Sequence, residues 1–72
     1  MMKRPLDALN KAKGKNVLVV LKNGKQITGV LQALDIHLNL WLDNAELNEE
    51  DKVVKLNTVL IRGDSIVYIS AE

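Results

Sequence analysis

Residues 17–34, which read VLVVLKNGKQITGVLQAL, decide the fold of this chain. The unbroken run of Val and Leu over Val17–Leu21 predicts a strand that is buried on both faces. Asn23-Gly24 follows, and this dipeptide between apolar runs is the strongest short-range signal of a β-hairpin. The return strand contains Gly29, and a glycine inside a strand marks a bend or a close approach of backbone. The stretch therefore predicts a bent antiparallel hairpin.

The sequence on either side of this hairpin predicts one helix and three more strands. Pro5 suits the first position of a helix because its missing N–H would have no partner there, and Gly14 suits the position just after the helix. The expected elements are a helix over about 5–13 and strands over about 16–22, 25–35, 38–47, 52–61 and 65–70. We therefore expect a mainly β fold in which a helix precedes a five-stranded antiparallel meander that tends to close into a barrel.

The length of 72 residues predicts a single domain over residues 1–72 that needs partners. A domain of this size buries only about 60% of its unfolded surface. The chain has no cysteine for a disulfide, and its single histidine argues against a zinc site made by the protein. Oligomerisation remains as the means of stabilisation, and we expect no metal and no cofactor.

Composition also narrows the setting in which the chain works. The absence of cysteine, of a signal-peptide pattern and of an apolar run long enough to span a bilayer predicts a cytoplasmic protein without a membrane partner. The net charge of +1 argues against a protein that grips nucleic acid by bulk charge. Strand counting places the basic helix and the loops at 35–39 and 62–64 at one end of the domain. It places Asn23-Gly24 and the acidic turn 48–51 at the other end.

Two short polar loops carry the candidate functional residues. The first reads Asp35-Ile36-His37-Leu38-Asn39, and alternation predicts that Asp35, His37 and Asn39 lie on one side, with Ile36 and Leu38 on the other. A structural interpretation, in which Asp and Asn stabilise a turn, is the default for Asp35 alone. It is weaker for Asn39, which starts an apolar strand.

The second loop reads Arg62-Gly63-Asp64, and it is either a tight turn made possible by glycine or a binding loop. In the functional interpretation Arg62 is a planar stacking group, and Asp64 orients either Arg62 or Asn39. A nominal triad of His37, Asp35 or Asp64, and Ser65 or Thr58 has no known mechanics, so we expect no enzyme. Single-stranded nucleic acid fits better, because a base stacks between a ring and a guanidinium while an amide reads its edge.

With both loops in view, the chain resembles the Sm/Sm-like family, most closely its short archaeal members. The first Sm motif covers the strands from Val17 to Asp43 and includes Gly29 and the loop 35–39. The second motif is Ile61-Arg62-Gly63-Asp64 with the apolar strand that follows. The resemblance implies a strongly bent five-stranded sheet, the Sm-fold small barrel. It also implies a homo-oligomeric ring, usually a heptamer, in which the fourth strand pairs with the fifth strand of the next subunit.

The same resemblance implies that uridine-rich single-stranded RNA binds around the central pore. In members with this pattern His37 stacks on the base, Asn39 bonds the uracil edge, Arg62 packs on the other face and Asp64 holds the Asn. Gly63 contributes backbone and Asp35 braces the loop.

Trp41 departs from the aliphatic residue that is usual in the third strand, and packing or an interface is favoured for it over base stacking. An alternative function for the chain is a ring-shaped protein-interaction scaffold without a specific uridine site.

Overall fold

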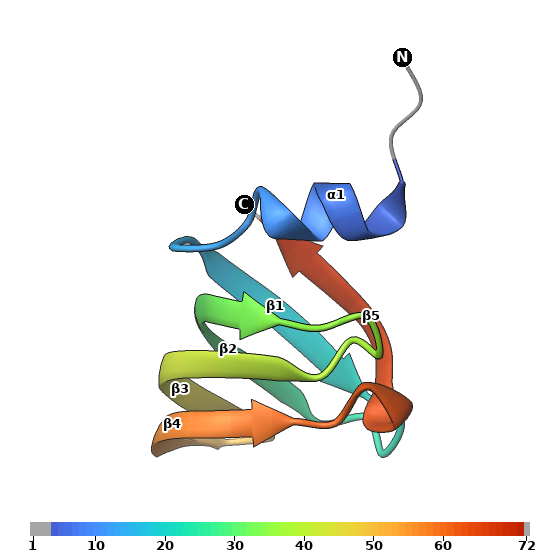
Figure 1. Ribbon diagram of the computed structural model, residues 1–72. Coiled ribbons are helices and arrows are strands. Elements are labelled where there is room, and N and C mark those ends of the chain that lie inside the picture. Colours follow the sequence, from blue (N-terminus) through green and yellow to red (C-terminus); the bar gives the residue numbers. More distant parts are fainter. Residues whose placement is uncertain (1–3, 72) are drawn as a thin grey trace.

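The structure is a computed structural model that describes residues 4–71 as one curled sheet with a helix beside it (Figure 1). The elements are α1 (Pro5–Asn10), β1 (Asn16–Leu21), β2 (Gln26–Leu34), β3 (Leu40–Glu49), β4 (Lys52–Ile61), the 3-10 helix η1 (Gly63–Ser65) and β5 (Ile66–Ala71). The strands pair antiparallel in the order β4-β3-β2-β1-β5. The predicted fold class is therefore confirmed. Met1, Met2, Lys3 and Glu72, which the one-domain prediction includes, lie outside the described residues.

Helix α1 starts where the sequence predicts and ends earlier, at Asn10 instead of about residue 13. The Asp7 carboxylate accepts a hydrogen bond from the Arg4 backbone N–H at 3.1 Å and so caps the first turn. Gly14 has a φ of +83°, but its N–H donates to the Leu31 carbonyl at 2.8 Å. Gly14 therefore ties the chain to β2 and does not cap α1. No helix within residues 4–71 is long and apolar enough to cross a membrane.

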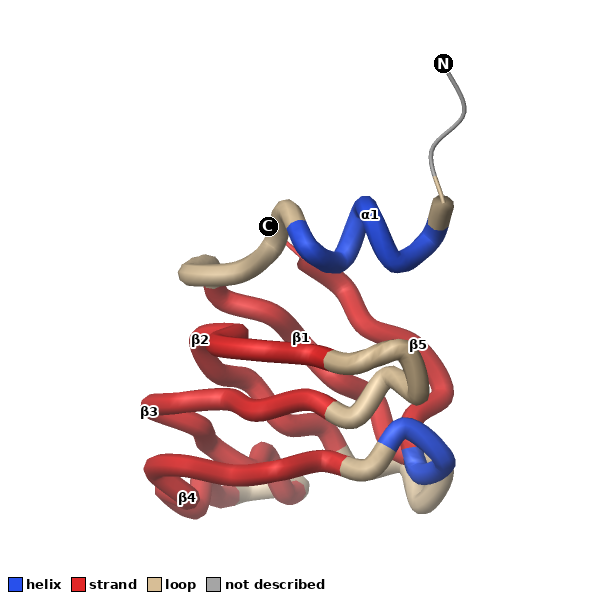
Figure 2. The backbone as a smooth tube through the Cα atoms, in the orientation of Figure 1, coloured by secondary structure: helices blue, strands red, loops and turns tan. Residues whose placement is uncertain are grey.

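The sheet curls because β2 bends at Gly29. A Cβ added at Gly29 would lie 3.1 Å from the Asp43 carbonyl oxygen and 3.2 Å from the Ala45 Cα, so β3 crosses tightly over this point. The pairing of β2 with β3 shifts register between Thr28 and Val30, on either side of the glycine. The bend predicted from the sequence is confirmed. Figure 2 shows the strands wrapping around a common interior.

The core fills the inside of the curl. Four side chains that are at most 1% exposed lie on the adjacent strands β1, β2 and β3: Val19, Leu31, Leu40 and Leu42. In β1 the buried and half-buried residues alternate, so the prediction of burial on both faces is wrong. The outer face of β1 stays partly open because the curled sheet covers only its inner face.

The position of the Asn23-Gly24 turn differs from the prediction. The backbone N–H of Lys22 donates to the Ser65 carbonyl at 2.9 Å, so the Asn23-Gly24 hairpin lies beside the segment that follows Arg62. Strand counting put these two turns at opposite ends, and that prediction is wrong. The count treated β5 as the neighbour of β4, whereas η1 carries the chain across to pair β5 with β1.

Candidate nucleic-acid site

The loop between β2 and β3 is a turn organised by the Asp35 carboxylate. Oδ1 of Asp35 accepts hydrogen bonds from the backbone N–H groups of His37 (2.9 Å) and Asn39 (3.0 Å). Leu38 takes a left-handed φ of +61°, and its N–H bonds back to the Asp35 carbonyl at 3.0 Å. The loop is therefore a turn and not an extended strand, so strand alternation is not what places its side chains. These backbone bonds to a short acidic side chain are what turn the chain.

The side-chain amide of Asn39 joins the two loops. Its Nδ2 donates to Oδ2 of Asp35 at 3.0 Å, and its Oδ1 accepts from the Gly63 N–H at 2.9 Å. An ionised carboxylate only accepts and a backbone N–H only donates, so these two partners fix which way the amide points. One N–H and one oxygen lone pair of Asn39 remain for a ligand.

Glycine is required at position 63 because the two loops touch there through their backbones. A Cβ added at Gly63 would overlap the carbonyl oxygen of His37 and lie 3.0 Å from the Leu38 carbonyl carbon. This close approach lets the Gly63 N–H reach Asn39. In the structure the Gly63 N–H therefore holds the Asn39 amide. A contact of Gly63 with RNA stays a prediction.

Arg62 and Asp64 form an exposed ion pair. The Arg62 Nη2 donates to Oδ2 of Asp64 at 3.1 Å, and the side chains are 83% and 68% exposed. Of the two roles considered for Asp64, the structure has the one in which it orients Arg62. The role implied by the family resemblance, in which Asp64 holds Asn39, is filled instead by Asp35 and Gly63.

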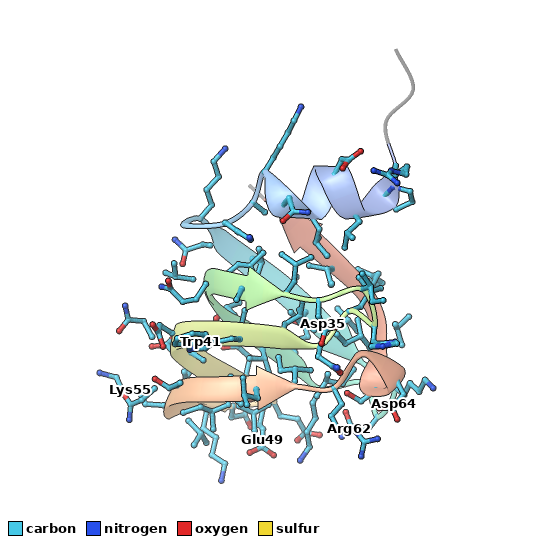
Figure 3. The ribbon with its side chains drawn as sticks, in the orientation of Figure 1. Asp35, Trp41, Glu49, Lys55, Arg62 and Asp64 are labelled. Carbon is cyan, nitrogen blue, oxygen red and sulfur yellow. The ribbon has the colours of Figure 1, made fainter. Side chains whose placement is uncertain are left out.

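All five residues predicted to bind RNA meet in one open hollow of about 520 Å³. Its lining consists of His37, Asn39, Arg62, Gly63 and Asp64. Asp35 does not line this hollow, which agrees with a bracing role beside it. Figure 3 shows Asp35, Arg62 and Asp64 gathered at one end of the molecule, with Lys55 on the far side. The hollow thus combines an imidazole, an amide and a guanidinium, the groups that stack on a base and read its edge.

Hydrogen bonding keeps the Asp35 carboxylate charged. The side chain of Asn39, then the backbone N–H groups of Asn39 and His37, lower the pKa of Asp35 below its ordinary value of 3.8. These donors stabilise the ionised form, which is the form that can accept from the amide. The hydrogen bond from the Asn39 amide to the Asp35 carboxylate is therefore intact at neutral pH.

One feature beside the site was not predicted from the sequence. The indole Nε1 of Trp41 donates to Oδ1 of Asp43 at 3.1 Å, and the Thr58 hydroxyl donates to the same oxygen at 2.9 Å. Trp41 is held in place in this way while 43% of it stays exposed. The sequence did contain a signal for this hydrogen bond. Trp41 and Asp43 are two residues apart on one strand, and residues with this spacing share a face of a sheet.

Comparisons with known proteins agree with this architecture. The LSM domain family model matches residues 7–71. The chain belongs to the LSM domain family. It is 51% identical over 71 residues to a protein of Methanosarcina barkeri named "Putative snRNP Sm-like protein", covering 97% of this chain and 99% of that one. A protein of the same name in Pyrococcus furiosus is 48% identical over 97% of this chain and 93% of its own length.

Solved structures of LSM proteins have the same fold. The P. aerophilum SmAP1 heptamer superposes with a TM-score of 0.93 at 33% identity, covering 100% of this chain and 97% of that chain. The Pyrococcus abyssii Sm protein, solved in complex with a uridine heptamer, gives a TM-score of 0.90 at 42% identity and covers 97% and 100%. The LSM family is not an enzyme family, so no catalytic role is assigned to His37 or its neighbours.

Proposed function

We propose that this chain assembles into a homoheptameric ring that binds uridine-rich single-stranded RNA at its central pore and acts in RNA metabolism in the cytoplasm. Support comes from the heptameric structure of the P. aerophilum relative and the uridine heptamer bound by the Pyrococcus abyssii relative. Within this chain, the observation that carries the proposal is the amide of Asn39, fixed between Asp35 and Gly63.

The fixed amide favours uracil over cytosine. Uracil offers an N3–H donor beside carbonyl acceptors, which matches the free lone pair and free N–H of Asn39. Cytosine offers an N3 acceptor beside an amino donor and needs the reverse orientation. Reversal would set the Asn39 Oδ1 against the Asp35 carboxylate and its NH₂ group against the Gly63 N–H. The hydrogen bonds of Asn39 with Asp35 and Gly63 therefore oppose the orientation that cytosine needs.

The remaining residues of the hollow hold the base from its faces. In this proposal the His37 ring stacks on one face and the Arg62 guanidinium on the other, while Asp64 keeps Arg62 in place through their ion pair. Base stacking contributes about 1–3 kcal/mol per base. A single site of this kind is weak. Seven linked sites would bind a short tract tightly, because each further base enters its pocket at a high effective concentration.

The sheet supplies edges for the ring. Strands β4 and β5 are the two ends of the strand order, so each has one neighbour within the protomer. Pairing of β4 with β5 of the next copy would use both free edges and leave none exposed in a closed ring.

Fluorescence anisotropy with labelled oligo-uridine and oligo-adenosine, on samples whose rings are verified by native mass spectrometry, tests this function. We expect tight binding of oligo-uridine only. Arg62→Ala and Asn39→Ala should each weaken it at least about tenfold, because each removes a stacking or edge contact, while rings still form. Lys55→Ala, which removes an exposed cation on the far side of the molecule, is the control (Figure 3). Equal or absent binding of both oligonucleotides by intact rings would favour the protein-interaction scaffold.

A further inference from the structure

A second hollow of about 480 Å³ borders the hollow of the candidate RNA site. Five apolar residues and three polar residues of the two loops line it: Ala33, Leu34, Trp41, Leu60, Ile61, Asp35, Asn39 and Arg62. Asn39 and Arg62 line both hollows. Whatever fills the second hollow therefore packs against residues that are proposed to hold the base.

The apolar wall of this hollow lies on the outer face of the sheet, at its β4 edge. Ala33, Trp41 and Leu60 stand directly opposite one another on β2, β3 and β4. Leu60 is 76% exposed and belongs to the edge strand, so the row is open at this end. The bond from Trp41 to Asp43 holds the indole in the row without covering it.

The other edge of the sheet carries a matching side chain. On β5, Tyr68 stands opposite Val20 on the outer face and is 56% exposed. Tyr68 lines neither hollow of its own protomer. An aromatic residue on one free edge thus faces solvent, as does an apolar row on the other edge.

One antiparallel register of the two edges places similar side chains side by side. If β5 of a second copy pairs antiparallel with β4 so that Tyr68 of the partner subunit meets Leu60, then Ser70 of the partner subunit meets Thr58. Apolar side chains then lie beside apolar ones and hydroxyls beside hydroxyls on the same face. The added strand would continue the row Ala33, Trp41, Leu60 with an aromatic ring.

We propose that Tyr68 of the neighbouring copy closes the hollow over Trp41, so that each RNA site is completed by the next subunit. This inference rests on the ring of the proposed function. It adds a coupling between ring assembly and RNA binding. Because the exposed Arg62 side chain forms part of the closed hollow, assembly orders this part of the RNA site. By thermodynamic reciprocity, bound RNA stabilises assembly.

The fluorescence of Trp41, the only tryptophan in the chain, tests this contact. In wild-type rings without RNA we expect Trp41 to be shielded from acrylamide. Tyr68→Ala should raise the quenching constant several-fold. Val53→Ala, which truncates an exposed apolar residue near the opposite end of β4, should leave it unchanged. Should Tyr68→Ala fail to assemble, Tyr68→Leu keeps an apolar side chain on the edge and must form rings with a more accessible Trp41.

The same Tyr68→Leu rings should bind oligo-uridine about tenfold more weakly, within the usual range of coupling between sites. Quenching that is the same in wild-type and Tyr68→Leu rings overturns the proposal. Shielding of Trp41 that appears only on addition of oligo-uridine also overturns it and assigns the hollow to a base. Native mass spectrometry separates these failures from failure of the ring. A wild-type ring with an open Trp41 refutes only the Tyr68 contact, whereas a wild-type monomer refutes both.

Discussion

One carboxylate, that of Asp35, shapes the candidate site. Its Oδ1 turns the loop by accepting two backbone N–H groups, and its Oδ2 holds the Asn39 amide. The same side chain therefore sets both the path of the backbone and the direction of the amide that would read a base. From the other loop, the Gly63 N–H donates to the oxygen of the same amide. Loss of either partner should release the amide without removing it.

Substitution of Asp35 by alanine tests this division of labour. We expect Asp35→Ala rings to bind oligo-uridine more weakly and to lose about tenfold in preference over oligo-cytidine, the scale of one well-formed hydrogen bond. Competition binding by anisotropy measures the preference. Asp51→Ala, in the acidic turn, is the matched control. An unchanged preference in Asp35→Ala would mean that the amide is not held by this carboxylate.

The lowered pKa of Asp35 predicts a pH dependence of stability. Because the folded-state pKa lies below 3.8, the stabilisation from Asp35 is fully present above that pH and is lost as pH falls through the lowered value. The difference in free energy of unfolding between wild type and Asp35→Asn should thus be constant from neutral pH to about pH 4 and shrink below it. Thermal unfolding across this range measures the difference. A difference that disappears well above pH 4 would contradict the assigned hydrogen bonds.

The residues that line the candidate site were predictable from sequence, and their pairings were not. His37, Asn39, Arg62, Gly63 and Asp64 were all named, and all five line one hollow. Which acidic residue would hold Asn39 depends on how two loops that are distant in sequence approach each other. The tight contact of Gly63 with the backbone of His37 decides that approach.

At the scale of elements, the bend of β2 determines where both loops arrive. Gly29 lies under β3 with backbone and side-chain atoms of three residues between 3.1 and 3.2 Å from where a Cβ would stand. A flat β2 would not bring β3 and β4 around to the place where Arg62 meets the turn at Asp35. The bend and the hairpin were predictable because glycine in a strand and Asn-Gly between strands are local signals. The order of the strands was not, since the pairing of β5 with β1 depends on the closure of the whole sheet.

Gly29→Val should destabilise the protein by about 1–3 kcal/mol, because the branched side chain overpacks the contact between β2 and β3. Urea unfolding measures the free energy. Gln32→Val places the same side chain at an exposed position of the same strand and should change stability little. Equal effects of the two substitutions would show that the crossing at Gly29 is not tight.

At the scale of the whole molecule, a small domain with two free sheet edges is matched to assembly. The protomer has a net charge of +1 and an open candidate hollow for a base, so a single copy would have little to hold RNA with. A ring repeats the hollow and closes the edges in one step. The sequence predicted the need for partners from size and composition, but it did not show the second hollow beside Trp41. That hollow arises from three strands packed side by side.

The central claim is that the fixed Asn39 amide reads the N3–H of uracil. The most direct measurement is the affinity of wild-type rings for oligo-uridine and for the same oligomer methylated at N3, which keeps the base's stacking face and removes the donor. The proposed contact predicts strong binding of oligo-uridine and a loss of at least about tenfold for the methylated oligomer, as one missing partner is repeated at every site. Equal affinity for the two oligomers would contradict the claim.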